Sequence, residues 1–232
     1  DRSAMGLILL YSLIFFIINK TLRKQIIIAG ISFIFLSVVL IIQNPAFKKR
    51  IFADTIGQFK GQYYENFLSE KENETKLNFM IFSFIHQTHY TTAFRMFLDK
   101  PLTGHGIKMF RFKCKDFQFK PKGVYKNTFG TLTKKGYGCS THPHNTYMQF
   151  LAESGIIGFL FILIVLIIVT KKLFKYFKSK KGLIPESSLL IGIFINLWPL
   201  IPTGNFFNNW LSMLYFVPVA YYFYETKFKY KS

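Results

Sequence analysis

Residues 146–169 read TYMQFLAESGIIGFLFILIVLIIV, the longest of five apolar runs, and this stretch decides the fold class. A helix needs roughly 20 apolar residues to cross about 30 Å of hydrocarbon. The other runs lie at 5–18, 25–43, 187–203 and 209–224, and only 25–43 among them is of similar length. We therefore predict an all-α integral membrane protein with about five transmembrane helices.

Composition supports a membrane location. Half of the 232 residues are hydrophobic, yet the formal net charge is +19. This pairing is unusual for a soluble domain and places the chain in a bilayer, in contact with membrane lipids and beside anionic groups. A nucleic-acid partner is excluded, because the cations divide between the membrane flanks and one long loop.

Orientation follows from the cations in the short connections, which favour the cytoplasmic side. These cations are Lys20, Arg23, Lys24, Lys171, Lys172, Lys175, Lys178, Lys180, Lys181, Lys227, Lys229 and Lys231. We therefore predict two membrane helices in 1–43, a periplasmic cap in 44–145, and three membrane helices with a short cytoplasmic tail in 146–232. The chain opens with Asp1 and not with Met, so we expect a fragment whose upstream helices are missing.

The long loop carries apolar residues throughout, so we predict a folded, mostly helical cap. A basic amphipathic helix is expected across 48–59, and a second helix across 77–99, before Pro101. Cys114 and Cys139 both lie in this loop. In an oxidising compartment they either form a disulfide or remain two unpaired thiols.

The segment before the long apolar run is the most informative for chemistry. It reads CSTHPHNTYMQFLAESGIIG at residues 139–158. Asn145 is a good N-cap, so the helix should begin there, with His144 at its positive end. That position disfavours imidazolium, and a neutral histidine can act as a general base. Free backbone N–H groups of the helix start are expected to attract phosphate oxygens.

These residues resemble the signature of the bacterial O-antigen ligase and polymerase family. The pair His144-Asn145 is followed by nine residues and then by Gly155-x-x-Gly158, at the family's spacing. Arg2-Ser3-Ala4 resembles the family's arginine-bearing helix start, and residues 101–106, PLTGHG, followed by Phe110-Arg111 resemble its Pro-x-x-Gly-x-Gly turn. The resemblance covers nearly all of the chain.

The resemblance implies a metal-independent, GT-C-like glycosyltransferase without a cofactor. It would be a multi-pass protein of the bacterial inner membrane and would move a glycan from undecaprenyl pyrophosphate to a sugar hydroxyl on the periplasmic side. A ligase uses lipid A-core as acceptor, and a polymerase uses the next lipid-linked repeat unit. His144 is then the base and Arg2 the leading pyrophosphate-binding cation, because a guanidinium holds two phosphate oxygens and stays charged. Arg111 and Arg95 are further substrate-binding candidates, and Lys108 is a weaker one.

One position departs from the family pattern. Many members carry an arginine about fifteen residues before the proline of the turn, where this chain has His86. His86 and His89 share one helical face, so they are candidates to bind pyrophosphate if protonated or sugar if neutral. Arg95 is the alternative replacement for the missing arginine. Asn145 is placed with the substrate-binding residues on the same resemblance.

Other readings stay open at this point. His142 reads as structural, and a zinc site built from His86, His89, His142 and His144 is conceivable from residue type alone. Glu153 either pairs with an arginine or faces water, and Asn205, Asn208 and Asn209 read as turn residues or sugar ligands. A flippase for lipid-linked sugars is the alternative function, although a transporter needs no such loop.

Overall fold

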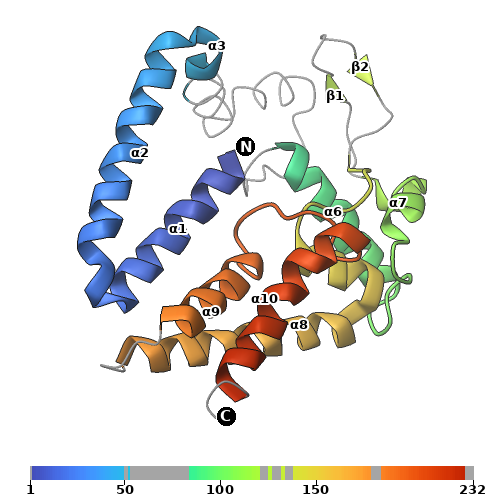
Figure 1. Cartoon of the computed structure of the whole chain (residues 1–232). Helices are drawn as coiled ribbons and strands as arrows, with labels where there is room; N and C mark the ends of the chain where they lie inside the picture. The colour runs from blue at the N-terminus through green and yellow to red at the C-terminus, as the bar shows by residue number, and fades with distance from the viewer. Residues whose placement is uncertain are drawn as a thin grey trace. The chain divides into compact units, whose positions relative to one another are not determined.

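The computed structural model describes residues 2–49, 52, 84–120, 125–126, 132–133, 138–178 and 184–227. Contacts divide the chain into two compact units (Figure 1). Unit 1 comprises Asp1–Ile51, Leu163–Trp198 and Asn209–Ser232, whereas unit 2 comprises Phe52–Ile162 and Pro199–Asn208. The predicted all-α class is confirmed for the described residues, apart from one short strand pair.

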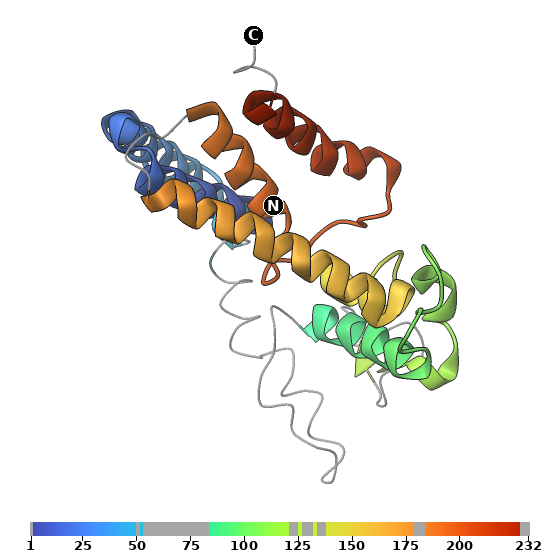
Figure 2. The same cartoon turned by 90° about the horizontal axis from the view of Figure 1, so that it is seen from below.

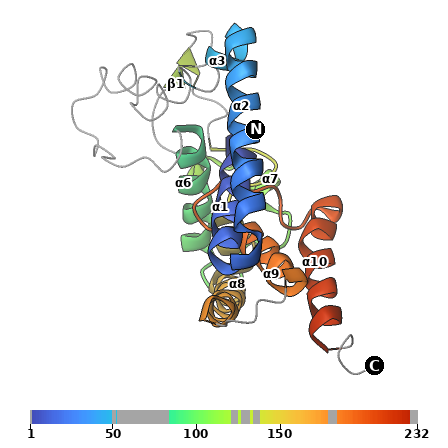
Figure 3. The same ribbon diagram turned by 60° about the vertical axis from the view of Figure 1, so that its left-hand side comes forward.

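The helices of unit 1 form on the apolar runs of the sequence. They are α1 (Arg2–Ile18), the 3-10 helix η1 (Lys20–Leu22), α2 (Arg23–Gln43), α3 (Pro45–Lys48), α9 (Ile184–Asn196), α10 (Asn209–Lys227), and the part of α8 (Thr146–Lys178) that follows Ile162. Helix α9 packs beside both α1 and α10 (Figure 1, Figure 2, Figure 3). Unit 1 is thus a small helical assembly in which α9 is central.

Polar contacts fix the start of α9 within unit 1. Ser187 is fully buried and its Oγ donates to Asn19 Oδ1 at 3.3 Å. Tyr176 donates its hydroxyl to Glu186 Oε2 at 3.0 Å. Buried polar groups of this kind are costly unless they are paired, so these contacts define how the helices of this unit align.

Among the residues that the structure describes, two helices are long and apolar enough to span a membrane. They are Lys20–Gln43, which includes α2, and α8. None of the residues of α2 is buried within the protein, although the helix is composed largely of Ile, Leu, Val and Phe. An apolar helix with no buried face is typical of a lipid-exposed segment.

The remaining three predicted spans are shorter helices. Helix α1 has 17 residues and α10 has 19. Helix α9 ends at Asn196 after 13 residues, ahead of Pro199 and Pro202, so the apolar run 187–203 is helical only in its first part. A helix of this length reaches about 20 Å, which is less than the hydrocarbon thickness. The arrangement with five spans stays a prediction, as does the division at residues 43 and 145.

Unit 2 contains the cap. Its elements are α6 (Phe84–Asp99), the one-turn helix α7 (Phe110–Lys113), the 3-10 helix η3 (Phe117–Phe119), the antiparallel pair β1 (Tyr125–Lys126) and β2 (Leu132–Thr133), and the first part of α8. Helix α6 lies beside that part of α8 (Figure 2), and their apolar faces meet in one core. The core residues are Ala93, Met96, Phe110, Cys114, Phe119 and Ala152.

The predicted helix across 77–99 is present as α6 from Phe84, and residues 77–83 lie outside the described part of the chain. Most of the amphipathic helix expected across 48–59 lies outside it as well. Cys114 and Cys139 form the disulfide, with Cα atoms 5.1 Å apart, and no free cysteine remains. The bridge joins the end of α7 to the segment that carries His142 and His144.

Candidate active site

Asn145 begins α8, as the sequence predicts. Its Oδ1 accepts hydrogen bonds from the backbone N–H groups of Tyr147 at 3.0 Å and Met148 at 3.1 Å. Its Nδ2 donates to the carbonyl of Pro199 at 2.9 Å. Asn145 therefore caps the helix with its own side chain. The cap occupies these two N–H groups, so they are not free for phosphate, and binding of phosphate at the helix start stays a prediction.

His144 adopts a left-handed backbone conformation directly before this cap. Its φ is +58°, which is uncommon for a residue other than glycine. The carbonyl of His144 accepts a hydrogen bond from the N–H of Thr203 at 3.0 Å. Surrounding structure must hold such a conformation in place, and outliers of this kind gather at functional sites.

Four histidines of unit 2 lie together around the ring of His144. The centroid of the His142 ring is 4.2 Å from that of His144, the centroid of His89 is 5.3 Å away, and that of His86 is 5.7 Å away. His86 and His89 come from one face of α6, whereas His142 and His144 come from the loop before α8. The structure therefore brings together His86, His89 and His144, three of the predicted site residues.

Burial keeps these histidines neutral. It is the main cause that lowers the pKa of His86, His89 and His142 to about 4, and repulsion from neighbouring imidazoles adds to it. Burial also lowers the pKa of His144. His89 and His142 are buried, while His144 is only partly so. The unprotonated form of His144 is thus favoured, and the residue is not fully buried.

Hydrogen bonds define the tautomers of the two buried rings. His142 donates from Nε2 to the carbonyl of Thr203 at 3.1 Å, so its Nδ1 accepts from the hydroxyl of Thr141 at 3.0 Å. The ring of His89 hydrogen-bonds the backbone of Gly138. Its Nδ1 is buried without a partner among the described residues. His89 therefore presents an unsatisfied acceptor beside His144.

The arginines differ in how far they are engaged. Arg95 donates from Nη1 to the carbonyl of Lys120, which occupies part of its guanidinium. Arg111 lies on α7, and its positive charge helps to lower the pKa of His142. In the part of the chain that the structure describes, the buried Nε of Arg111 has no hydrogen-bond partner. The side chain of Arg2 lies outside the described part.

The glycine turn 101–106 and the start of α8 interlock. The N–H groups of His105 and Gly106 donate to the carbonyls of Ala152 and Glu153 at 3.0 and 2.9 Å. Gly155 has φ +65° and ψ −160°, a region open essentially to glycine alone. A Cβ there would lie 2.4 Å from the carbonyl carbon of Leu102. Backbones can approach this closely only when both turns carry glycine.

Gly104, in the 101–106 turn, lies equally close to the backbone of α8. A Cβ on Gly104, whose φ is +66°, would lie 2.4 Å from the carbonyl carbon of Glu153. The Pro-x-x-Gly-x-Gly and Gly-x-x-Gly motifs are therefore two halves of one contact. That contact holds α7, and Arg111 with it, against the helix that follows His144.

Comparison with known proteins agrees with these motifs. The sequence model of the O-antigen ligase family matches residues 1–163, which is well over half of the chain. The chain belongs to the O-antigen ligase family. No curated protein sequence and no solved structure matches it. Family membership confirms the resemblance seen in the sequence.

Membership in the O-antigen ligase family defines the chemistry in general terms. Its members are membrane-integral enzymes of the glycosyltransferase type, which use a lipid-linked glycan donor and a glycan acceptor. The two helices that can cross a bilayer agree with this location. Among the described residues, no group of three or more His, Cys, Asp or Glu side chains is placed to hold a metal ion, the histidine cluster included.

Sequence reasoning missed a polar network inside unit 2 of this O-antigen ligase family protein. Gln149 is fully buried and hydrogen-bonds both Glu153 and Asn205. The sequence predicts either an arginine partner or water for Glu153. In the structure its Oε1 accepts the N–H of Phe110 at 3.0 Å, and the charge of Arg111 also acts on its carboxyl group. A glutamine in the first turn of an apolar helix was the available signal, because a polar side chain there needs a partner.

Proposed function

We propose that this protein transfers a glycan from undecaprenyl pyrophosphate to a sugar hydroxyl, with His144 as the general base. The observation that carries the proposal is the neutral, partly exposed ring of His144 at the head of α8. An acceptor hydroxyl must lose its proton as it attacks the anomeric carbon, and an unprotonated imidazole accepts it. The bond between that carbon and the pyrophosphate oxygen breaks, and the lipid pyrophosphate leaves.

Guanidinium groups balance the charge that develops on the leaving pyrophosphate. Arg111 is supported by its buried, unpartnered Nε and by its electrostatic influence on His142, next to the base. Arg2 remains the second cation of the proposal, on the resemblance alone. Arg95 ranks below Arg111 because the carbonyl of Lys120 already holds part of its guanidinium. Two fixed cations stabilise a departing diphosphate without needing to reorganise.

The histidines of α6 are proposed to contact sugar, and not pyrophosphate. Their pKa values of about 4 keep His86 and His89 uncharged at neutral pH, so they attract an anion only weakly. The unpartnered Nδ1 of His89 can accept a hydrogen bond from a hydroxyl donor. Asn145 is proposed to act through its helix cap, since both ends of its amide are engaged.

The proposal places transfer on the periplasmic side of a five-span inner-membrane domain. Short connections rich in lysine support a cytoplasmic location for the opposite ends of the helices. The Cys114–Cys139 disulfide supports an oxidising compartment for unit 2. Lipid A-core and a second lipid-linked repeat unit are the two acceptors that separate a ligase from a polymerase.

The test is glycan transfer from undecaprenyl pyrophosphate by the intact protein in membranes, with each acceptor in turn. His144→Asn is the sharpest variant, because asparagine tolerates the left-handed conformation but cannot act as a base. We expect its rate to fall at least about a hundredfold, and added imidazole to restore part of the rate in His144→Ala. His105→Gln is the matched control, since His105 hydrogen-bonds the Met96 carbonyl, away from the cluster.

Retention of transfer in His144→Asn, at matched amounts of folded protein, would overturn the proposal. A flippase predicts another pattern, in which translocation of the lipid-linked sugar survives the substitution and no transfer is found in the parent protein. Transfer in the presence of a chelator is expected to continue, as the family resemblance implies.

A further inference from the structure

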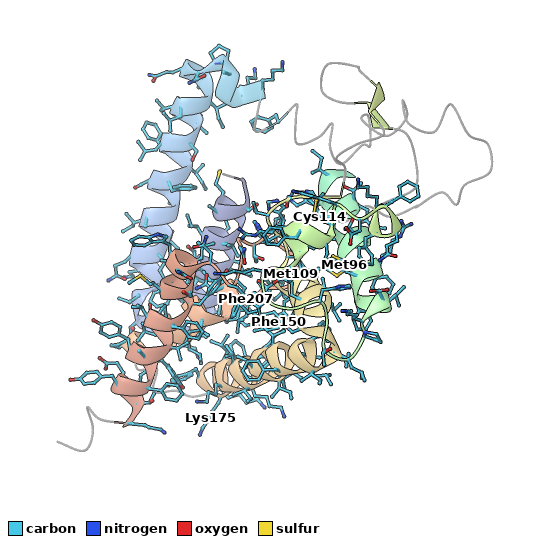
Figure 4. All side chains as sticks on the ribbon, turned by 90° about the vertical axis from the view of Figure 1, so that its right-hand side faces the viewer. Met96, Met109, Cys114, Phe150, Lys175 and Phe207 are labelled. Atoms are coloured by element: carbon cyan, nitrogen blue, oxygen red, sulfur yellow. A yellow bond between two sulfur atoms is a disulfide. The ribbon has the colours of Figure 1, made fainter. Side chains whose placement is uncertain are left out.

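Residues 199–208, PLIPTGNFFN, lie outside the part of the chain that the family matches, yet they belong to unit 2. This 199–208 segment follows α9 and has no helical turn of its own before α10. Figure 4 labels Phe207 in this segment beside Phe150 of α8, and their ring centroids are 5.2 Å apart. The segment therefore packs on the first turns of α8.

Thr203 makes three hydrogen-bonding contacts with residues 142–146, the segment that carries His142 and His144. Its N–H donates to the carbonyl of His144 at 3.0 Å, and its carbonyl accepts from His142 Nε2 at 3.1 Å. Its hydroxyl is 3.0 Å from that of Thr146. A fourth bond, from Asn145 to Pro199, holds the beginning of the segment. The 199–208 segment therefore hydrogen-bonds four of the five residues from 142 to 146, namely His142, His144, Asn145 and Thr146.

Asn205 anchors the far end of the same segment. Its Oδ1 accepts from Gln149 Nε2 at 2.7 Å and from the N–H of Phe207 at 3.0 Å. Gln149 uses its other N–H on Glu153 Oε2 at 3.0 Å, and its Oε1 accepts from the N–H of Phe206. Gln149, Glu153 and Asn205 are all buried, so each bond lost there would leave a costly unsatisfied group.

We propose that the 199–208 segment is a positioning element for His144, and that Asn205 and Thr203 are its positioning residues. The inference rests on the proposed role of His144 and extends the site beyond the family-matched residues. Thr203 holds the backbone of His144 in its left-handed turn, and Asn205 holds Thr203 in register with α8. Without the segment, the turn at residues 142–145 relaxes, because a strained conformation persists only while its surroundings fix it.

The central variant is Asn205→Ala, which removes the oxygen shared by Gln149 and Phe207. Asn205→Asp keeps an acceptor at that position and serves as the conservative rescue. Ser187→Ala is the matched control, because it deletes a buried side-chain hydrogen bond of the same kind in unit 1. Each variant is assayed as intact protein in membranes, and rates are normalised to protein that retains the Cys114–Cys139 disulfide.

We expect Asn205→Ala to lower kcat at least about tenfold while KM for the lipid-linked donor changes less than about threefold, since the defect is in the placement of the base. Asn205→Asp should recover most of kcat. The acid limb of the pH profile should move to higher pH in Asn205→Ala, because a freed His144 is better solvated. In the part of the chain that the structure describes, the titratable rings packed around His144 are those of His86, His89 and His142, and the charge of Arg111 acts on His142. The 199–208 segment contains no charged residue.

A second readout does not depend on transfer. Modification of His144 by diethyl pyrocarbonate, followed by mass spectrometry, should be at least about threefold faster in Asn205→Ala than in the parent protein or in Ser187→Ala. Unchanged labelling together with unchanged kcat would overturn the positioning role and leave His144 as the base. Full transfer by His144→Asn would overturn the base, while the labelling rates would still report whether the segment holds the ring.

Discussion

Helix α2 and the first turns of α8 both lie in apolar runs of the sequence, but only the first turns of α8 bury side chains within the protein. None of the residues of α2 is buried, and its Ile, Leu and Phe side chains are exposed along its length. The first turns of α8 bury Thr146, Gln149 and Glu153 in hydrogen bonds. The apolar surface of α2 is that of a candidate membrane span, whereas the first turns of α8 depend on polar partners that the protein itself supplies.

Glycine substitutions should produce the largest difference in stability between α2 and the first turns of α8. Gly155→Ala forces a side chain into a glycine-only conformation and against the backbone of Leu102. We expect unit 2 to lose on the order of 3–6 kcal/mol, and transfer to be abolished. Gly30→Ala in α2 meets nothing within 4 Å and should be neutral or stabilising by up to about 1 kcal/mol.

Denaturant titration in detergent, followed by hydrogen exchange of peptides from each unit, measures both effects. A Gly155→Ala protein whose unit 2 keeps the parent protection would show that the two glycine turns do not interlock as described.

Removal of the disulfide should have the next largest effect. The double variant Cys114→Ser, Cys139→Ser opens a loop with a sequence separation of 25. The loop-entropy estimate gives a loss of about 3 kcal/mol. We expect faster exchange in α7 and at His142, and no change in unit 1. Equal protection of unit 2 in the presence and absence of reductant would contradict this.

Much of the fold was predictable because its signals are local. Apolar runs predicted α1, α2, α8 and α10, and the Asn145 cap predicted where α8 begins. The glycines of 101–106 predicted a turn, whereas the kink at Gly155 was not predicted. These features depend on residues a few positions apart, where helix geometry and steric limits decide the outcome.

The rest of the candidate site was not predictable, because it is made by contacts distant in sequence. Asn205 meets Gln149 across 56 positions and Thr203 meets His142 across 61. In the sequence alone, Asn205 was indistinguishable from a turn residue. The pairing of His86 and His89 with His144 likewise depends on how α6 packs in unit 2, which periodicity does not determine.

Substitution by arginine should cost more at an apolar residue that faces lipid than at one that faces water. Leu36 of α2 is 60% exposed and Phe117 of η3 is 91% exposed. If α2 is in hydrocarbon, Leu36→Arg should cost about 3 kcal/mol in an insertion assay, because a favourable leucine is lost and an unfavourable arginine is gained. Phe117→Arg should leave the stability of unit 2 within about 0.5 kcal/mol. Equal insertion of the parent and Leu36→Arg segments would contradict a membrane location for α2.

Acidification should also act differently on the two units. All five histidines lie in unit 2. Burial lowers the pKa of His86, His89 and His142 to about 4 in the folded state. The unfolded chain binds protons at these rings near their ordinary pKa of 6.5, so between pH 6.5 and 4 it binds more protons than the folded state. The stability of unit 2 should therefore fall as pH falls through that window.

Unit 1 has no histidine and should change little over the same range. Hydrogen exchange at pH values from 7 to 4, corrected for the intrinsic exchange rate, reads the two units separately. His89→Asn removes one ring that is protonated only in the unfolded state, so the stability of unit 2 should depend less steeply on pH in this variant than in the parent. If both units lost protection together, or if the variant kept the full slope, the acid sensitivity would have to come from carboxylates and not from the histidine cluster.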